Sequence, residues 1–164
     1  MRNGAKRMAV CAMLTALCVV LMLLGAVLEL GMYAAPLFAG LSFLPVGRQY
    51  GRTYHLLVYG ASCLLCFLLV PNIEQNLMLA GLFGWYPILR PLLQKLPRLL
   101  RLPAKLLFFN TVIVAIEALV MLVLVPETVG TALLWILLLL GNVVFFTYDL
   151  LIPRMDALFS RLIQ

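Results

Sequence analysis

Long apolar runs, separated only by short polar connections, cover most of this chain of 164 residues. Apolar side chains make up 65% of it, against about 45–50% in a typical soluble domain. A water-soluble fold of this size could not bury so many apolar side chains, so lipid must be the main solvent. Because lipid offers no hydrogen-bond partner to backbone N–H and C=O groups, only helices or a closed β-barrel can span a bilayer. The runs are continuous rather than alternating, which favours helices.

Six segments can span about 30 Å of hydrocarbon, some only with help from neighbouring helices. They are predicted at residues 8–28, 31–46, 54–70, 77–93, 106–125 and 130–150. Pro36 and Pro45 interrupt the second segment, which we expect to be tilted, broken or partly re-entrant. Glycines and Pro87 predict a kink near residues 85–87 in the fourth. The predicted fold is an all-α membrane protein, a single domain formed by a bundle of six transmembrane helices.

The basic residues predict the orientation of these spans. With the N-terminus in the cytoplasm, all 12 lysines and arginines fall in the inner segments. The outer turns contain Glu29, Glu74 and Glu127 and no base, as the positive-inside rule requires. The sequence therefore predicts a multi-pass protein of the cell (cytoplasmic) membrane with both termini inside. Since topology accounts for the net charge of +6 and no reader module is present, nucleic acid is not an expected partner.

The longest inner connection is predicted at residues 94–105. Its leucines and bases follow an amphipathic pattern, and Pro97 and Pro103 are expected to break it. We expect this segment to lie along the cytoplasmic interface, with its leucines in lipid and its bases at the headgroups. Two roles stay open: an interfacial anchor, or a docking surface for a cytoplasmic or membrane partner.

Glu117 lies in the middle of the fifth predicted span, where a charged side chain costs about 2.5–3.5 kcal/mol. We therefore expect this carboxyl group to face the bundle interior, to be protonated or to bind a ligand. Asn110, seven residues earlier, lies on nearly the same face of the helix. Two interpretations stay open for this polar stripe: an interhelical hydrogen bond that only stabilises packing, or a ligand or ion site.

Aromatic side chains at a similar depth favour a pocket. At a helical rise of about 1.5 Å per residue, Glu117 and Trp85 lie about 13 Å below the outer turns and Tyr59 about 16 Å. Trp85 and Tyr86 are thus far from the headgroup level at which an aromatic belt would place them. Their rings and the carboxyl group could bind an apolar or cationic small molecule, with Asn142 as a floor. Packing alone would also explain each ring.

The remaining chemically active residues give weaker signals. Cys63 and Cys66 have the spacing of a redox dithiol, but no loop contains a second pair, and buried cysteine commonly packs as a small apolar residue. His55, the only histidine, is predicted at headgroup level, with a proton-linked or ligand role as the alternative. No cluster of metal ligands and no nucleophile–base pair is visible. Neither a cofactor nor an enzymatic activity is predicted.

The first span has a face of small residues. Alanines recur at four-residue steps, and Ala12 and Ala16 lie in its inner half. Small residues at this spacing let two helices approach closely. Ala12 and Ala16 are therefore candidate docking residues for a partner subunit, with packing inside the chain as the alternative.

Both ends of the chain resemble one family of membrane proteins. The run AVCAMLTALCVVLMLLG (residues 9–25) is similar to the first helix of substrate-binding S components of energy-coupling factor (ECF) vitamin transporters. The run FFTYDLLIPRMDALFSRL (residues 145–162) resembles their last helix, which often closes with an aromatic–Asp pair and a base, here Tyr148, Asp149 and Arg154. Length, six spans and inside termini agree across nearly the whole chain.

The middle of the chain resembles a subgroup of these proteins in FGWYPILRPLLQKL (83–96) and KLLFFN (105–110). No thiamine, riboflavin, biotin or folate signature is recognised. Because the family's ligand-binding residues vary with the vitamin, none is carried over to this chain.

The resemblance implies a small-molecule pocket that opens outward and is formed with the later helices. It also implies that the first-span alanine face contacts a membrane-embedded coupling subunit, which two ATPase subunits drive from the cytoplasm. The expected function is the binding and translocation of a small, vitamin-like nutrient.

Two alternatives belong to other classes. A structural membrane subunit of cell-envelope or cell-shape machinery, similar to the rod-shape-determining protein MreD, would have no ligand pocket and would bind wall-synthesis proteins. A membrane enzyme acting on lipids or thiols is the other.

Overall fold

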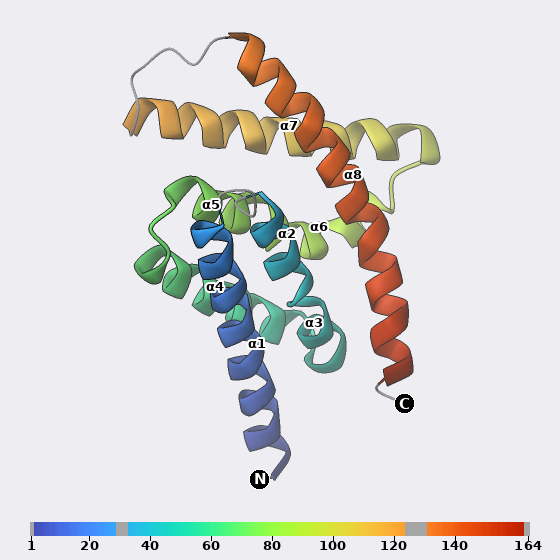
Figure 1. Cartoon of the computed structure of the whole chain (residues 1–164). Helices are drawn as coiled ribbons and strands as arrows, with labels where there is room; N and C mark the ends of the chain where they lie inside the picture. The colour runs from blue at the N-terminus through green and yellow to red at the C-terminus, as the bar shows by residue number, and fades with distance from the viewer. Residues whose placement is uncertain (1, 29–32, 124–130, 163–164) are drawn as a thin grey trace.

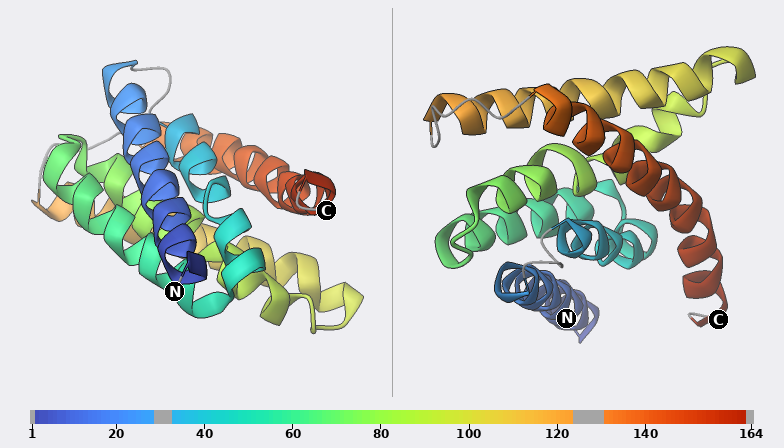
Figure 2. Two further views of the ribbon diagram at one scale, coloured as in Figure 1. Left: turned by 90° about the horizontal axis from the view of Figure 1, so that it is seen from below. Right: turned by 45° about the horizontal axis from the view of Figure 1, so that its top comes forward.

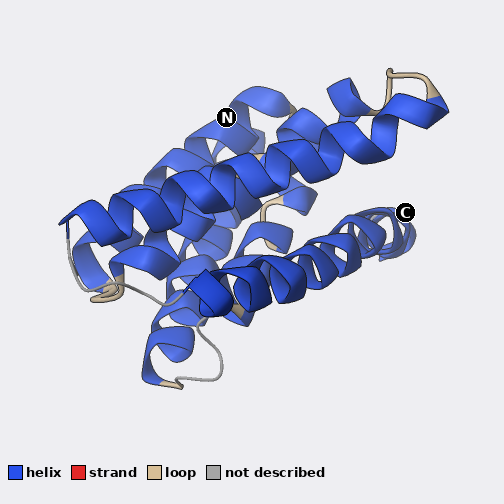
Figure 3. Ribbon diagram, turned by 90° about the horizontal axis from the view of Figure 1, so that it is seen from above, coloured by secondary structure: helices blue, strands red, loops and turns tan. Residues whose placement is uncertain are grey.

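The computed structural model describes residues 2–28, 33–123 and 131–162 (Figure 1). Over these ranges the chain is helical and contains no strand (Figure 3). The elements are, in chain order, α1 (Arg2–Val27), α2 (Ala34–Leu41), α3 (Leu44–Tyr50), α4 (Arg52–Leu69), α5 (Ile73–Met78), the π-helical segment η2 (Leu79–Phe83), α6 (Tyr86–Leu93), α7 (Arg98–Val123) and α8 (Thr131–Leu162). The predicted all-α fold is thereby confirmed.

Four helices of the described part, α1, α4, α7 and α8, are long and apolar enough to cross a membrane. They correspond to the first, third, fifth and sixth predicted spans. Only 28% of the most apolar stretch of α1 is buried inside the protein, and only 11% of that of α7. Because so much apolar surface is left uncovered by the protein itself, these helices indicate a membrane-embedded protein.

The second predicted span is broken, as expected, into the short helices α2 and α3. The two are separated at residues 42–43, where the Ser42 hydroxyl donates a 2.6 Å hydrogen bond to the carbonyl of Ala39. Pro36 and Pro45 both lie in the first turn of a helix, where the missing proline N–H removes no hydrogen bond. At 8 and 7 residues, neither helix alone can span the hydrocarbon.

The fourth predicted span is also irregular. The π-helical segment η2 follows α5, and its last hydrogen bond joins the Gly84 N–H to the Leu79 carbonyl at 2.9 Å. Residues 84–85 then separate η2 from α6, whose first turn contains Pro87. The predicted kink near residues 85–87 is therefore confirmed, and the π-helical segment lies just before it.

Two tyrosine hydroxyls bind backbone carbonyls of η2. Tyr59 on α4 donates to the carbonyl of Ala80 at 2.5 Å, and Tyr148 on α8 donates to that of Phe83 at 2.8 Å. Irregular backbone is tolerated at membrane depth only where the protein itself satisfies its polar groups. These bonds therefore attach η2 to two long helices and stabilise its departure from α-helical geometry.

One expectation about the inner connection is wrong. Pro103 does not break the chain, because residues 98–105 form the first turns of α7, which continues to Val123. The helix starts where the Pro97 carbonyl accepts hydrogen bonds from Leu100 and Arg101 at 2.9 and 3.1 Å. Pro103 lies in the second turn of α7, where a proline removes one backbone hydrogen bond, and the helix continues through it. Only residues 94–97 form a separate link, and an interfacial position for this region stays a prediction.

The helices pack around two hydrophobic cores. One core joins α1 to α2, α3 and α4, and the other joins α2, η2 and α6 to α7 and α8. Figure 2 shows α1 and α7 on opposite sides of the molecule with the short helices between them, and Figure 1 shows α8 crossing α7. In Figure 1 the start of α1 and the end of α8 lie at the same end of the molecule.

Gly40 permits close approach where the two cores meet. A Cβ atom at this position would lie 2.6 Å from the Phe83 carbonyl oxygen and 2.8 Å from the Tyr148 hydroxyl. Both distances are below van der Waals contact, so a side chain here would push α2 away from η2 and α8.

Candidate functional site

A cavity of about 280 Å³ lies beside Glu117. Its described lining residues come from α5, η2, α7, α8 and the residue that precedes α2. They are Tyr33, Met78, Phe83, Phe109, Ile113, Glu117, Leu140, Gly141 and Val144. We call this space the Glu117 cavity. It is a mostly apolar space with very few polar groups, which is the usual composition of a small-molecule site.

The side chains of Tyr33 and Glu117 are the polar groups among these described lining residues. Glu74, in the first turn of α5, interacts electrostatically with both of them. The aromatic rings of Phe83 and Phe109 form part of the wall. A carboxyl group beside aromatic rings can bind a ligand with an apolar body and a cationic or hydrogen-bond-donating group.

The position of Glu117 follows from the helical repeat of α7. Phe109, Ile113 and Ile116 are buried in the core that joins α7 to α8. Glu117 comes four residues after Ile113, on the same face. It is half-buried, which agrees with the expectation that a mid-span carboxyl group faces the interior.

Of the six predicted ligand-binding residues, Glu117 alone is among the described residues that line this cavity. Tyr59 and Trp85 lie together elsewhere, with ring centroids 6.4 Å apart. The Tyr59 hydroxyl is occupied by its hydrogen bond to η2, and Trp85 is 38% exposed. The depth argument placed these residues at similar levels, but depth does not determine which way a side chain points around its helix.

Tyr86 belongs to a different cluster. Its ring is fully buried, and it lies 4.8 Å from the ring of Phe145, edge to face. Its hydroxyl donates a 2.6 Å hydrogen bond to Asp149 Oδ1. The position of Tyr86 is therefore determined by α8, and the structure does not bring it to the Glu117 cavity.

Asn110 and Asn142 bind each other. Asn142 Nδ2 donates to Asn110 Oδ1 at 2.9 Å and to the Leu138 carbonyl at 2.7 Å. Asn110 shares a helix face with Glu117, but seven residues separate the two by about 10 Å along the axis. The pair joins α7 to α8, which favours the packing interpretation of these two polar residues. Gly141, next to Asn142, lines the cavity instead.

A charged cluster around Asp149 was not among the predicted sites. The Asp149 carboxylate accepts hydrogen bonds from Tyr86, from Arg90 Nε at 2.9 Å and from Lys105 Nζ at 2.5 Å. The three charged side chains are only 13–16% exposed. The sequence pointed to Asp149 only through the family resemblance, because no spacing rule pairs residues 44 and 59 positions apart. The cluster holds α6, α7 and α8 together.

The candidate docking residues Ala12 and Ala16 are exposed on α1. They line a shallow depression of about 580 Å³ between α1 and α4, together with Thr15, Ala61 and Leu65 among others. Packing within the chain therefore leaves these two alanines accessible.

The cysteines and His55 lie apart from the Glu117 cavity. Cys18 on α1 and Cys66 on α4 are fully buried and belong to the same core, which fits a packing role. No group of residues able to hold a metal ion is present in the described part of the chain. His55 is buried at the start of α4.

Comparisons with protein-family models, with curated proteins and with solved structures give no match for this chain. The functional argument therefore uses the residues and geometry described above.

Proposed function

We propose that this chain is the substrate-binding and translocation subunit of an ECF-type, ATP-driven importer of a small, vitamin-like nutrient. The observation that carries the proposal is the Glu117 cavity. A mid-span carboxyl group is costly in lipid, and here it faces a space that a small molecule could fill. The structural alternative predicts no ligand pocket, so a cavity beside a carboxyl group favours a binding subunit.

The proposal includes six membrane crossings with both termini in the cytoplasm. The pairs α2–α3 and α5–α6 would then act as two interrupted crossings beside the four long helices. Two features support this topology. The start of α1 and the end of α8 lie at one end of the molecule (Figure 1). Arg48, Arg52 and Lys95, from two different predicted inner connections, line one pocket.

Transport would need partners, because the sequence contains no phosphate-binding loop. Under the proposal, Ala12 and Ala16 contact the membrane-embedded coupling subunit, and two ATPases in turn drive this coupling subunit. The exposure of both alanines beside the depression between α1 and α4 supports this assignment. ATP hydrolysis would tilt the chain in the membrane and release the nutrient inward.

The test is gentle purification of the tagged chain from its native host, followed by mass spectrometry of the proteins that co-purify. A multi-span membrane protein together with two ATPases is the expected result. Replacing both Ala12 and Ala16 with Leu should remove these partners, whereas replacing Ala5 and Ala9, toward the N-terminal end of α1, should affect them less. Co-purification of wall-synthesis or cell-shape proteins instead would contradict the proposal and favour the structural alternative.

A further inference from the structure

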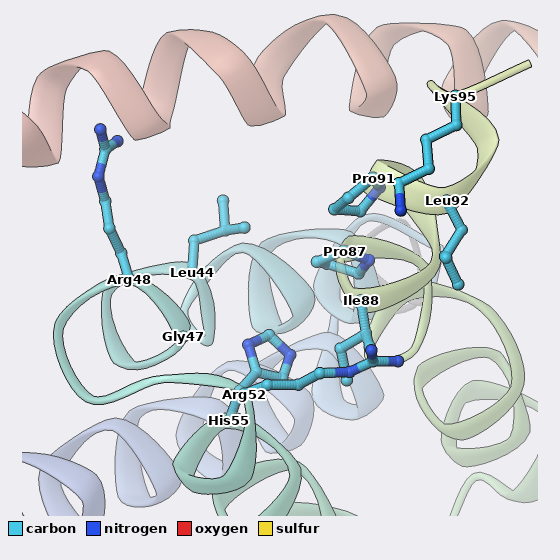
Figure 4. Close-up of a pocket in the computed structure, with 10 residues that line it drawn as sticks. All are labelled: Leu44, Gly47, Arg48, Arg52, His55, Pro87, Ile88, Pro91, Leu92 and Lys95. Carbon is cyan, nitrogen blue, oxygen red and sulfur yellow. The ribbon is translucent and has the colours of Figure 1, made fainter.

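A second pocket, which shares none of its described lining residues with the Glu117 cavity, is rich in basic side chains. It measures about 480 Å³ and lies between α3, the start of α4 and α6 (Figure 4). Its described lining residues are Leu44, Gly47, Arg48, Arg52, His55, Pro87, Ile88, Pro91, Leu92 and Lys95. They include no acidic residue. We call this space the basic pocket.

Arg52 and Lys95 provide its positive charge. Both are exposed, and no described carboxylate forms an ion pair with either of them. In Figure 4 both side chains extend along the pocket, whereas Arg48 points toward α8. Two cations without a nearby anion repel each other, so a bound anion would stabilise this arrangement.

The buried side chain of His55 distinguishes this pocket from an exposed basic patch. The residue is only 4% exposed. Its ring interacts with the backbone of Gly84, but its Nε2 atom makes no well-aligned hydrogen bond within the described residues. The ring contacts Phe43 edge to face, with the ring centroids 5.9 Å apart, and its Nδ1 atom faces Gly47, where a Cβ would lie 2.8 Å away. A buried ring nitrogen without a well-aligned hydrogen bond is stabilised by a ligand that supplies one.

The other lining residues of the pocket indicate what the ligand contains besides its anionic group. Leu44, Ile88 and Leu92 supply apolar surface, and Pro87 and Pro91 have no backbone N–H group to donate. An anion with an attached apolar portion matches this lining better than a small hydrated ion does. Phospholipids with a net negative charge have this composition, and basic pockets between membrane helices bind their headgroups.

We propose that the basic pocket binds the phosphate group of an anionic ligand, with Arg52 and Lys95 as its counter-charges and His55 as a hydrogen-bond partner. The site is separate from the Glu117 cavity and does not depend on its ligand. Two sources of the phosphate fit the chemistry: the headgroup of an anionic phospholipid and a soluble phosphate ester. The apolar walls favour the lipid.

The test is native mass spectrometry of the intact chain in detergent, with phosphatidylglycerol or glycerol 3-phosphate added as the probe. Phosphatidylcholine, whose headgroup has no net charge, is the control ligand. The double variant Arg52→Gln/Lys95→Gln should bind phosphatidylglycerol at least ten-fold more weakly than the wild type. The control variant Lys6→Gln/Arg7→Gln removes the same charge outside the pocket and should bind as the wild type does.

Each outcome decides the question. Selective binding of phosphatidylglycerol supports a lipid source, and binding of glycerol 3-phosphate that the pocket variant abolishes supports a soluble one. Equal binding by the pocket variant and the control variant, or equal binding of phosphatidylcholine and phosphatidylglycerol, would overturn the proposal. His55→Phe keeps the ring contact with Phe43 and removes the nitrogens, so unchanged affinity in that variant would also contradict it.

Discussion

The Glu117 cavity and the basic pocket both have apolar walls but differ in the charge of their polar side chains. The cavity is apolar, has Glu117 and Tyr33 as its described polar side chains, and is lined by α7 and α8. The basic pocket is lined by α3, α4 and α6, and its described charges are all positive. Under the two proposals, the same fold binds a neutral or cationic molecule in one space and an anion in the other. In the proposed orientation the basic pocket lies on the cytoplasmic side, where the positive-inside rule places bases.

The largest effect is expected at Asp149, because its cluster joins α6 of the basic pocket to α7 and α8 of the Glu117 cavity. In Asp149→Ala the half-buried Arg90 and Lys105 lose their shared counter-charge. Removal of one partner from a buried ion pair costs about 3–5 kcal/mol. Thermal unfolding in detergent should show a large loss of stability, and both ligands should bind more weakly. The exposed Arg154→Gln, on the same helix, should change stability by less than about 0.5 kcal/mol.

A variant at Gly40 should weaken ligand binding in the Glu117 cavity without affecting the basic pocket. Gly40→Ala forces a Cβ against the Phe83 carbonyl and Tyr148, and overpacking of this kind costs about 1–3 kcal/mol. Because Phe83 lines the Glu117 cavity, ligand binding there should weaken while phosphatidylglycerol binding is unchanged. Gly60→Ala is the matched control, since a Cβ there meets nothing within 4 Å. Equal melting temperatures for the two variants would show that the close contact at Gly40 is unimportant.

Added salt should weaken ligand binding more in the basic pocket than in the Glu117 cavity. Raising the salt concentration from about 0.1 M to about 1 M shortens the Debye length from about 10 Å to about 3 Å. Arg52 and Lys95 are exposed, so binding of phosphatidylglycerol should weaken several-fold, whereas a ligand beside the half-buried Glu117 should be screened much less. Titrations at both salt concentrations measure this, and an equal loss in both pockets would remove the electrostatic distinction between them.

The smallest effect is expected at the asparagine pair, which belongs to neither pocket. Hydrogen bonds between membrane helices contribute about 0.6 kcal/mol on average. A double-mutant cycle with Asn110→Leu and Asn142→Leu should give a coupling energy of this size and leave both ligands bound. Loss of ligand binding in either single variant would show that Asn110 or Asn142 takes part in ligand binding, as the sequence predicted.

The long helices were predictable because lipid imposes a simple rule on the sequence: about 20 consecutive apolar residues per crossing. The breaks in the second and fourth segments were predictable too, because proline removes a backbone donor wherever it occurs. The same rule failed at Pro103, because α7 continues through this proline despite the lost hydrogen bond. Local rules thus predicted the elements and most of their interruptions.

The grouping of side chains was not predictable in the same way. Tyr86 meets Asp149, and Tyr59 meets the carbonyl of Ala80, and these contacts depend on how helices rotate and cross. Depth along a helix can be counted from the sequence, but rotation about its axis depends on packing against the neighbours. Glu117 could be assigned an inward position from its cost in lipid, whereas the residues around it could not be named.

The most direct test of the account asks what small molecule the purified chain holds in the Glu117 cavity. Wild-type protein and the variants Glu117→Gln and Thr111→Val, the latter at an exposed position of α7 outside the cavity, are purified from the native host, and molecules released on denaturation are identified by mass spectrometry. The account predicts one small nutrient in near-stoichiometric amount on the wild type and on Thr111→Val, and a loss of at least ten-fold on Glu117→Gln, with all three proteins equally stable. The same amount of that molecule on Glu117→Gln as on the wild type would contradict the account.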